Sequence, residues 1–128
     1  MLTVTKILDG EKNSIVHVFV AGGNGDLKKE VIIDPSNFAM GKFNKFAIDS
    51  ISYALHGFSA VISFSEGIEG IPALVLSEEQ SFTLDLTEYG GLKDMSGADG
   101  NGNILLSTYG LNESNKSGMV IIKLHKIR

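Results

Sequence analysis

The hydrophobic pattern of this chain is that of short strands separated by turns. Apolar and polar side chains alternate along residues 81–87 and again along residues 118–126. A period of two is typical of a strand with one face in the core and one face in solvent. The expected core positions are Phe82, Leu84 and Leu86 in the first segment and Val120, Ile122 and Leu124 in the second.

One segment is apolar on both faces. Residues 14–21 read SIVHVFVA. Such a strand is expected to be covered on both sides, by the core and by a second surface. One face carries Val16, Val18 and Val20, and the other carries Ile15, His17 and Phe19.

The whole chain is predicted to be one all-β domain, residues 1–128, folded as a jelly-roll-like β-sandwich of about eight or nine strands. Fifteen glycines and only two prolines occur between short apolar runs, which favours strands joined by tight turns. A parity switch between Ile48 and Ile51 predicts either a β-bulge or a strand that begins after Asp49. Further strands are expected at residues 2–8, 28–33, 48–56, 60–65, 71–76 and 104–109.

Residues 34–46 have the least regular pattern. Asp-Pro-Ser opens a turn, and the apolar residues that follow are spaced too unevenly for a strand. We expect a loop in which Phe38 and Phe43 either pack over an open end of the sandwich or face a partner.

Candidate catalytic, cofactor and metal sites are weak, so none is assigned. Residues 97–108 lack the first and last ligands of a calcium loop. Residues 21–27 lack a phosphate-binding pattern, and residues 22–25 within them are expected to form a hairpin turn. His17, His56 and His125 fall on separate strands, the paired glutamates fall in turns, and there is no cysteine. The expectation is that the protein is not an enzyme.

Charge and hydropathy exclude two classes of partner. The net charge of −4 argues against nucleic acid, and no apolar run approaches the roughly 20 residues of a membrane helix, so a soluble, unexported protein is expected. Seven acidic residues and one lysine occupy residues 66–94, whereas the tail after Glu113 carries four basic residues and no acidic ones. These segments either pair within one copy, or they dock copies against each other or orient the domain on a larger surface.

The C-terminal half resembles the small virion structural proteins of tailed bacteriophages. The resemblance rests on DLTEYGGLKD at residues 85–94, GNILLSTYG at 102–110 and SGMVIIKLHK at 117–126, and it extends over about two-thirds of the chain. Segment 63–76 lacks the tryptophan that often follows the central hairpin in such proteins. The resemblance implies a β-sandwich subunit on a capsid or at the neck, with no catalytic residues.

We therefore expect a virion structural protein that decorates or stabilises a phage capsid or acts at the neck. It would be made in the host cytoplasm, form a homo-oligomer and bind the major capsid protein or another virion protein. The alternative is a β-sandwich that binds a carbohydrate or a host surface. The expected contact residues are Phe38, Phe43, Ile15, His17, Phe19, Lys123 and Lys126.

Overall fold

A computed structural model describes residues 1–38, 45–65, 71–94 and 101–127 of the chain. Ten strands in two antiparallel sheets occupy these residues, with two short 3-10 turns, η1 (Pro35–Asn37) and η2 (Thr87–Tyr89). The strands are β1 (Leu2–Asp9), β2 (Asn13–Ala21), β3 (Glu30–Ile33), β4 (Lys45–His56), β5 (Ser59–Phe64), β6 (Ile71–Leu76), β7 (Glu79–Asp85), β8 (Leu92–Lys93), β9 (Ile104–Tyr109) and β10 (Ser117–Ile127). No helix in the described ranges is long and apolar enough to cross a membrane.

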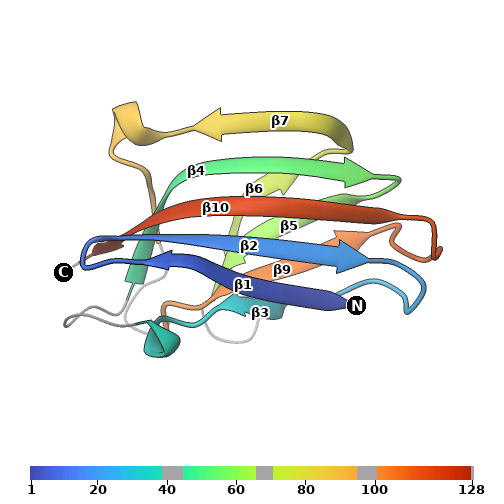
Figure 1. The fold of residues 1–128 in the computed structure, drawn as a ribbon, viewed down its shortest axis with the longest axis horizontal. Coiled ribbons are helices and arrows are strands. Elements are labelled where there is room, and N and C mark those ends of the chain that lie inside the picture. The colour runs from blue at the N-terminus through green and yellow to red at the C-terminus, as the bar shows by residue number, and fades with distance from the viewer. Residues whose placement is uncertain (39–44, 66–70, 95–100, 128) are drawn as a thin grey trace.

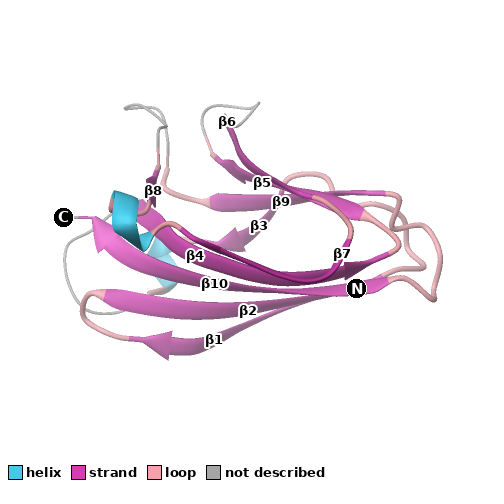
Figure 2. Ribbon diagram, turned by 90° about the horizontal axis from the view of Figure 1, so that it is seen from above, coloured by secondary structure: helices cyan, strands magenta, loops and turns pink. Residues whose placement is uncertain are grey.

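The two sheets form a sandwich with jelly-roll topology, as the sequence predicted (Figures 1 and 2). The larger sheet has the order β1-β2-β10-β4-β7, with β8 paired to β4, and the smaller has the order β3-β9-β5-β6. The pairs β2–β10, β3–β9, β4–β7 and β5–β6 are nested along the chain, as in a double-stranded ribbon rolled into two layers. The short strand β8 is the one that the hydrophobic pattern did not predict.

The core lies between the sheets and contains the expected faces of β2 and β10. Val16 and Ile122 are fully buried, and Val120 and Leu124 are nearly so. The chain also brings Phe58 beside Gly118 of β10, where an added Cβ would lie 2.8 Å from the Phe58 ring. A glycine at this position therefore makes room for a core aromatic.

The parity switch in β4 is a β-bulge at Asp49. Lys123 of β10 pairs with Ser50 and Leu124 pairs with Ile48, which leaves Asp49 as the extra residue. The alternative, a strand beginning after Asp49, is wrong, because β4 already starts at Lys45.

The predicted core face of β7 has the right orientation but is not fully buried. Phe82 pairs with Tyr53 and Leu84 pairs with Ile51, so both side chains belong to the inner face. Phe82 is nevertheless 46% exposed, and Leu84 is only half-buried. The physical reason is that β7 is the edge of the larger sheet, where the smaller sheet does not extend to cover it.

Residues 22–25 do not form the hairpin turn expected from their sequence. They belong to the crossover from β2 in the larger sheet to β3 in the smaller one. The amide of Gly22 in this crossover donates to the carbonyl oxygen of Lys116 at 2.8 Å. An added Cβ would lie only 2.2 Å from the carbonyl oxygen of Glu113.

Candidate functional site

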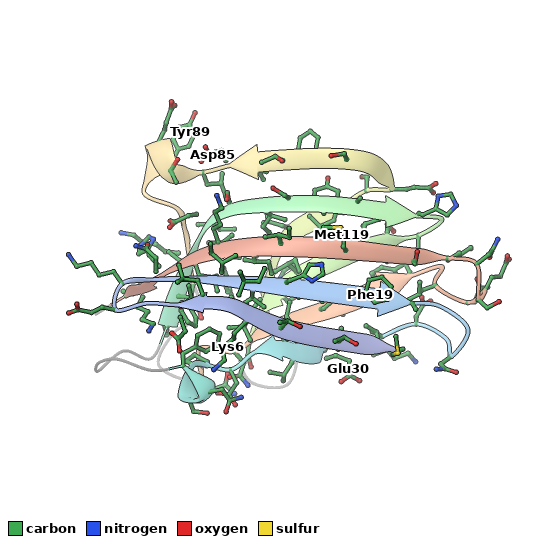
Figure 3. All side chains as sticks on the ribbon, viewed as in Figure 1. Lys6, Phe19, Glu30, Asp85, Tyr89 and Met119 are labelled. Atoms are coloured by element: carbon green, nitrogen blue, oxygen red, sulfur yellow. The ribbon has the colours of Figure 1, made fainter. Side chains whose placement is uncertain are left out.

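Four of the expected contact residues gather on the outer face of the larger sheet, which faces the viewer in Figure 3. Ile15, His17 and Phe19 point outward from β2, and Lys123 points outward from β10, with Ile15 as its direct cross-strand partner. Their core-facing neighbours are buried, so strand alternation leaves these four side chains on one surface. Phe19 is exposed, so the described part of the chain does not cover the outer face of β2 at this position, and a second surface that covers it stays a prediction.

Two large apolar side chains lie side by side toward one end of this face. Phe19 and Met119 are direct cross-strand partners on β2 and β10, and 36% and 37% of their respective surfaces are exposed (Figure 3). Ser52 and Thr83 hydrogen bond to each other on the same face, 3.0 Å apart. The paired strands β2 and β10 thus hold the two apolar side chains next to each other.

A groove of about 720 Å³ opens along one end of this face. Phe19, Met119 and Ala54 provide apolar walls, and His56 and Glu78 add polar groups from β4 and from the turn before β7. The complete lining is His17, Phe19, Ala54, Leu55, His56, Glu78, Ser117, Gly118 and Met119. Such a mixture of apolar surface and a few polar groups is typical of binding sites.

Lys126 is not part of this surface. Its side chain points into the end of the sandwich and is completely buried. The ammonium donates to Asp9 Oδ1 at 2.9 Å and to the carbonyl oxygen of Gly10 at 2.7 Å. A buried charge needs such partners, so Lys126 acts inside the chain and holds the β1–β2 turn against β10.

Phe38 lies apart from the outer face and is half-buried. Its ring packs edge-on against Phe46 with the centroids 4.9 Å apart, and the ammonium of Lys6 lies over it at 5.0 Å. This arrangement corresponds to packing over an end of the sandwich, the first of the two alternatives for this loop. Phe43 falls outside the described residues.

The structure also pairs two residues that the sequence did not connect. His125 Nδ1 and Asp49 Oδ1 are 2.6 Å apart, and both side chains are partly exposed. Gly91 packs against them with φ of +83°, and an added Cβ would lie 2.8 Å from Asp49 Oδ1. The parity switch at Asp49 was the only sequence signal for this pair, since 76 residues separate the two side chains.

Two exposed carboxylates are held by local hydrogen bonds. The backbone amide of Leu111 lowers the pKa of Asp26, with further lowering from the amide of Gly110 and the hydroxyl of Thr108. The side chain and backbone of Thr87 lower the pKa of Asp85, to which Lys123 adds a smaller effect. Both carboxylates therefore order loops, and neither belongs to a cluster of three metal-binding side chains in the described part of the chain.

The calcium-like segment is described only in part. Asn103 donates its amide to Asn101 Oδ1 at 2.9 Å, and its carbonyl oxygen accepts from Ser65. Gly102 has a φ of +82° and leads into β9. The described end of the segment therefore forms a turn, whereas Asp99 falls outside the described residues.

Comparison with known proteins gives similarity of fold at low sequence identity. No family model matches the chain, and no curated protein matches its sequence. The acidic stable capsid structure of Helicobacter pylori bacteriophage KHP30 includes a chain that is 11% identical, with a TM-score of 0.49 over 98% of this chain and 93% of that one. A cupin superfamily protein from Desulfitobacterium hafniense is 11% identical, with a TM-score of 0.36 over 100% and 79%. The polyketide cyclase RemF from Streptomyces resistomycificus is 7% identical, with a TM-score of 0.38 over 99% and 68%.

These comparisons contradict the expectation that the chain is not an enzyme. The similar structures include an enzyme, the polyketide cyclase RemF, and a fold by itself does not decide whether a protein is an enzyme. The absence of a catalytic sequence motif is weak evidence against enzymatic activity in a β-sandwich. Pairing of strands that are distant in the chain can bring polar side chains together, as it does for His125 and Asp49. The prediction from the sequence that the protein is not an enzyme is therefore withdrawn.

Proposed function

We propose that this chain is a structural protein of a bacteriophage virion, which decorates or stabilises the capsid or acts at the neck. The observation that carries the proposal is the outer face of the larger sheet. An exposed pair of large apolar side chains, Phe19 and Met119, lies there beside a groove on a rigid sheet. Exposed apolar surface of this kind is characteristic of protein contact sites.

The chemistry of the face fits contact with other proteins. The exposed apolar pair has charged residues on both sides along the strands, Glu78 in the groove and the cross-strand row of Lys123 and Asp85, which resembles the apolar core and charged rim of protein interfaces. On a repeated capsid lattice, modest affinity at each contact is sufficient, because many contacts act together. The resemblance of residues 85–126 to phage virion proteins supports the same assignment.

The proposal is tested by asking whether the chain is part of the particle. Phage particles that encode it are purified on a density gradient, and the chain is quantified by mass spectrometry in intact particles and in free protein. We expect a fixed copy number in the particle fraction. Its absence from particles would refute the proposal, and binding of an oligosaccharide in the groove would then favour the carbohydrate-binding alternative.

A binding experiment connects this result to the surface. Labelled protein is sedimented with particles that lack it, and Phe19→Ser is compared with Tyr89→Ser. Tyr89 is 80% exposed on η2, away from the face, so it provides a matched loss of an exposed aromatic ring. We expect Phe19→Ser alone to reduce binding, with unchanged circular dichroism in both variants.

A further inference from the structure

Strand β1 is an edge of the larger sheet, and its outer side pairs with no strand in the described part of the chain. The sheet begins with β1, and β2 is the strand that pairs with it (Figures 1 and 2). The two strands keep one register over five consecutive pairs, from Leu2–Val20 to Lys6–Val16. The other edge strands keep a constant register over at most four consecutive pairs, and β6 also contains Pro72. A regular, unpaired edge of this kind is a template for another strand.

The hydrogen bonds at the start of β1 show which backbone groups point to the free edge. Met1 and Ala21 exchange two backbone hydrogen bonds, one from the Met1 ammonium at 2.8 Å and one from the Ala21 amide at 2.9 Å. In an antiparallel pair, such hydrogen-bonded pairs alternate with pairs that are not hydrogen-bonded to each other. Thr3, two residues after Met1, is therefore also bonded to β2. The groups that point to the free edge are the amides and carbonyl oxygens of Leu2, Val4 and Lys6.

These free backbone groups are self-complementary in one antiparallel register. When Val4 lies opposite Val4 of a second copy, Leu2 lies opposite Lys6 of that copy. Each of these pairs then exchanges two backbone hydrogen bonds. A shift of one copy by two residues leaves either Leu2 or Lys6 without a partner inside the regular run. The register centred on Val4 therefore uses all the free groups of residues 2–6.

The side chains are compatible with the same register. On the outer face, Thr3 lies opposite Thr5 of the second copy, and cross-strand threonine pairs stabilise a sheet. On the inner face, Val4 is 39% exposed although it pairs with a buried position of β2, and Val4 of the second copy would cover part of this apolar surface. Lys6 does not face a second Lys6, and its ammonium donates to the carbonyl oxygen of Asn37 in its own copy at 2.5 Å.

We infer that β1 pairs with β1 of a second copy, antiparallel and centred on Val4, so that the two larger sheets form one continuous sheet. Residues paired across antiparallel strands point to the same face, so the two-fold axis of this dimer is perpendicular to the sheet. The outer faces of both copies, with Phe19 and Met119, therefore lie on the same side of the dimer (Figure 3). The pairing stands apart from the proposed function, to which it adds two contact faces presented together.

The expected dimer is weak, because the shared edge is short. Pairing over residues 2–6 covers less surface than the roughly 800 Å² that each partner buries in a standard interface. We therefore expect a dissociation constant of roughly 10 μM to 1 mM in solution. On a particle, neighbouring copies are held close together, so a weak edge contact is sufficient there.

Disulfide trapping tests the register, since the native chain contains no cysteine. Thr3 and Thr5 of the second copy form a pair that is not hydrogen-bonded, with Cα atoms about 4.5 Å apart, which suits a disulfide. A mixture of Thr3→Cys chains and Thr5→Cys chains should therefore cross-link under mild oxidation. In either variant alone, the two cysteines are diagonal neighbours about 7–8 Å apart, so the cross-linked yield should be less than about a tenth of that of the mixture.

Sedimentation equilibrium of the full chain tests the edge itself. Val4→Pro removes an amide that points to the free edge, so it breaks no bond between β1 and β2, and proline is tolerated on this side of an edge strand. We expect it to raise the dissociation constant at least about tenfold. Val4→Thr is the matched control, because it keeps the amide and a β-branched side chain, and its constant should stay within about threefold of the native one.

A variant that does not depend on backbone tolerance provides a second measurement. The thermal midpoint of each variant is recorded, so that an unfolded Val4→Pro chain is recognised. Thr3→Lys combined with Thr5→Lys then replaces it. Both positions are exposed, and the two lysines would place like charges directly opposite each other in the dimer. This double variant should also raise the dissociation constant at least about tenfold.

A chain that stays monomeric at about 1 mM would overturn the inference. So would a dimer that Val4→Pro and the double lysine variant leave unchanged, or equal cross-linking of Thr3→Cys alone and of the mixture. A monomeric chain whose Val4→Pro variant loses binding to particles would show that a strand of another virion protein occupies the edge, which also contradicts pairing of two copies. A dimer that is absent from particles contradicts only the virion assignment.

Discussion

The buried ammonium of Lys126 allows a sharp test of how the end of the sandwich is held together. Lys126→Met keeps the length and most of the apolar stem but removes the charge. Its partners, Asp9 and the carbonyl oxygen of Gly10, lie 2.9 and 2.7 Å from the ammonium. Without it, the carboxylate of Asp9 stays in a position where its side chain is only 17% exposed.

The magnitude follows from the loss of the two contacts that the ammonium makes. Removing one partner of a fully buried ion pair costs about 3–5 kcal/mol. Asp9 keeps some contact with water and accepts a hydrogen bond from Ser14 at 3.3 Å, so the lower part of that range applies. We expect Lys126→Met to reduce the free energy of unfolding by about 2–4 kcal/mol.

Urea unfolding at pH 7 measures this change. With a denaturant dependence of about 1–3 kcal/mol/M, the midpoint should fall by roughly 1–2 M. Lys28→Met, at an exposed position, serves as the control and should change the free energy by less than about 0.5 kcal/mol. Adding Asp9→Asn to Lys126→Met should recover part of the loss, because the largely buried negative charge is then removed. Equal effects of Lys126→Met and Lys28→Met would refute the reasoning.

Three further predictions follow from burial, hydrogen bonding and backbone conformation. Ile122→Ala should cost about 2–5 kcal/mol in urea unfolding, since the side chain is fully buried, whereas Phe82→Ala on the overhanging edge should cost clearly less. Asp26→Asn should lower the thermal midpoint at pH 7. Because its hydrogen bonds to loop amides lower the pKa of Asp26, their contribution is present above about pH 4 and is lost as the pH falls through the lowered pKa, so native and variant midpoints should converge in acid. Gly91→Ala should cost about 1–3 kcal/mol by the same unfolding assay, since Gly91 has φ of +83° and an added Cβ would crowd the carboxylate of Asp49.

Local sequence pattern was sufficient to identify most of the strands. Alternation in β10 placed Val120, Ile122 and Leu124 in the core, because side chains on a strand change face at every residue. The parity switch at Asp49 marked a true bulge for the same reason. The two-residue strand β8 was missed, since two residues carry no period.

The candidate site was only partly visible in the sequence. The pattern of β2 placed Ile15, His17 and Phe19 on one face, and the structure adds Met119 and Ala54 beside them. These neighbours come from β10 and β4, which are far away in the chain. Their place on a shared surface depends on which strands pair, and a single strand's alternation says nothing about its neighbours.

By itself, then, the sequence determined where strands occur, which face of each strand is apolar, and the all-β class, because these features depend on local backbone geometry and hydrophobic periodicity. The tertiary structure decided which strands lie at the edges, and so left Phe82 exposed although its orientation is that of a core residue. Alternation already puts Lys126 on the face of Leu124 and opposite to Lys123, but the tertiary structure decided how a lysine is buried there, because Asp9 and Gly10 of the β1–β2 turn supply its partners. Burial depends on what the second sheet and the adjoining turns cover, and those contacts are made by residues distant in the chain.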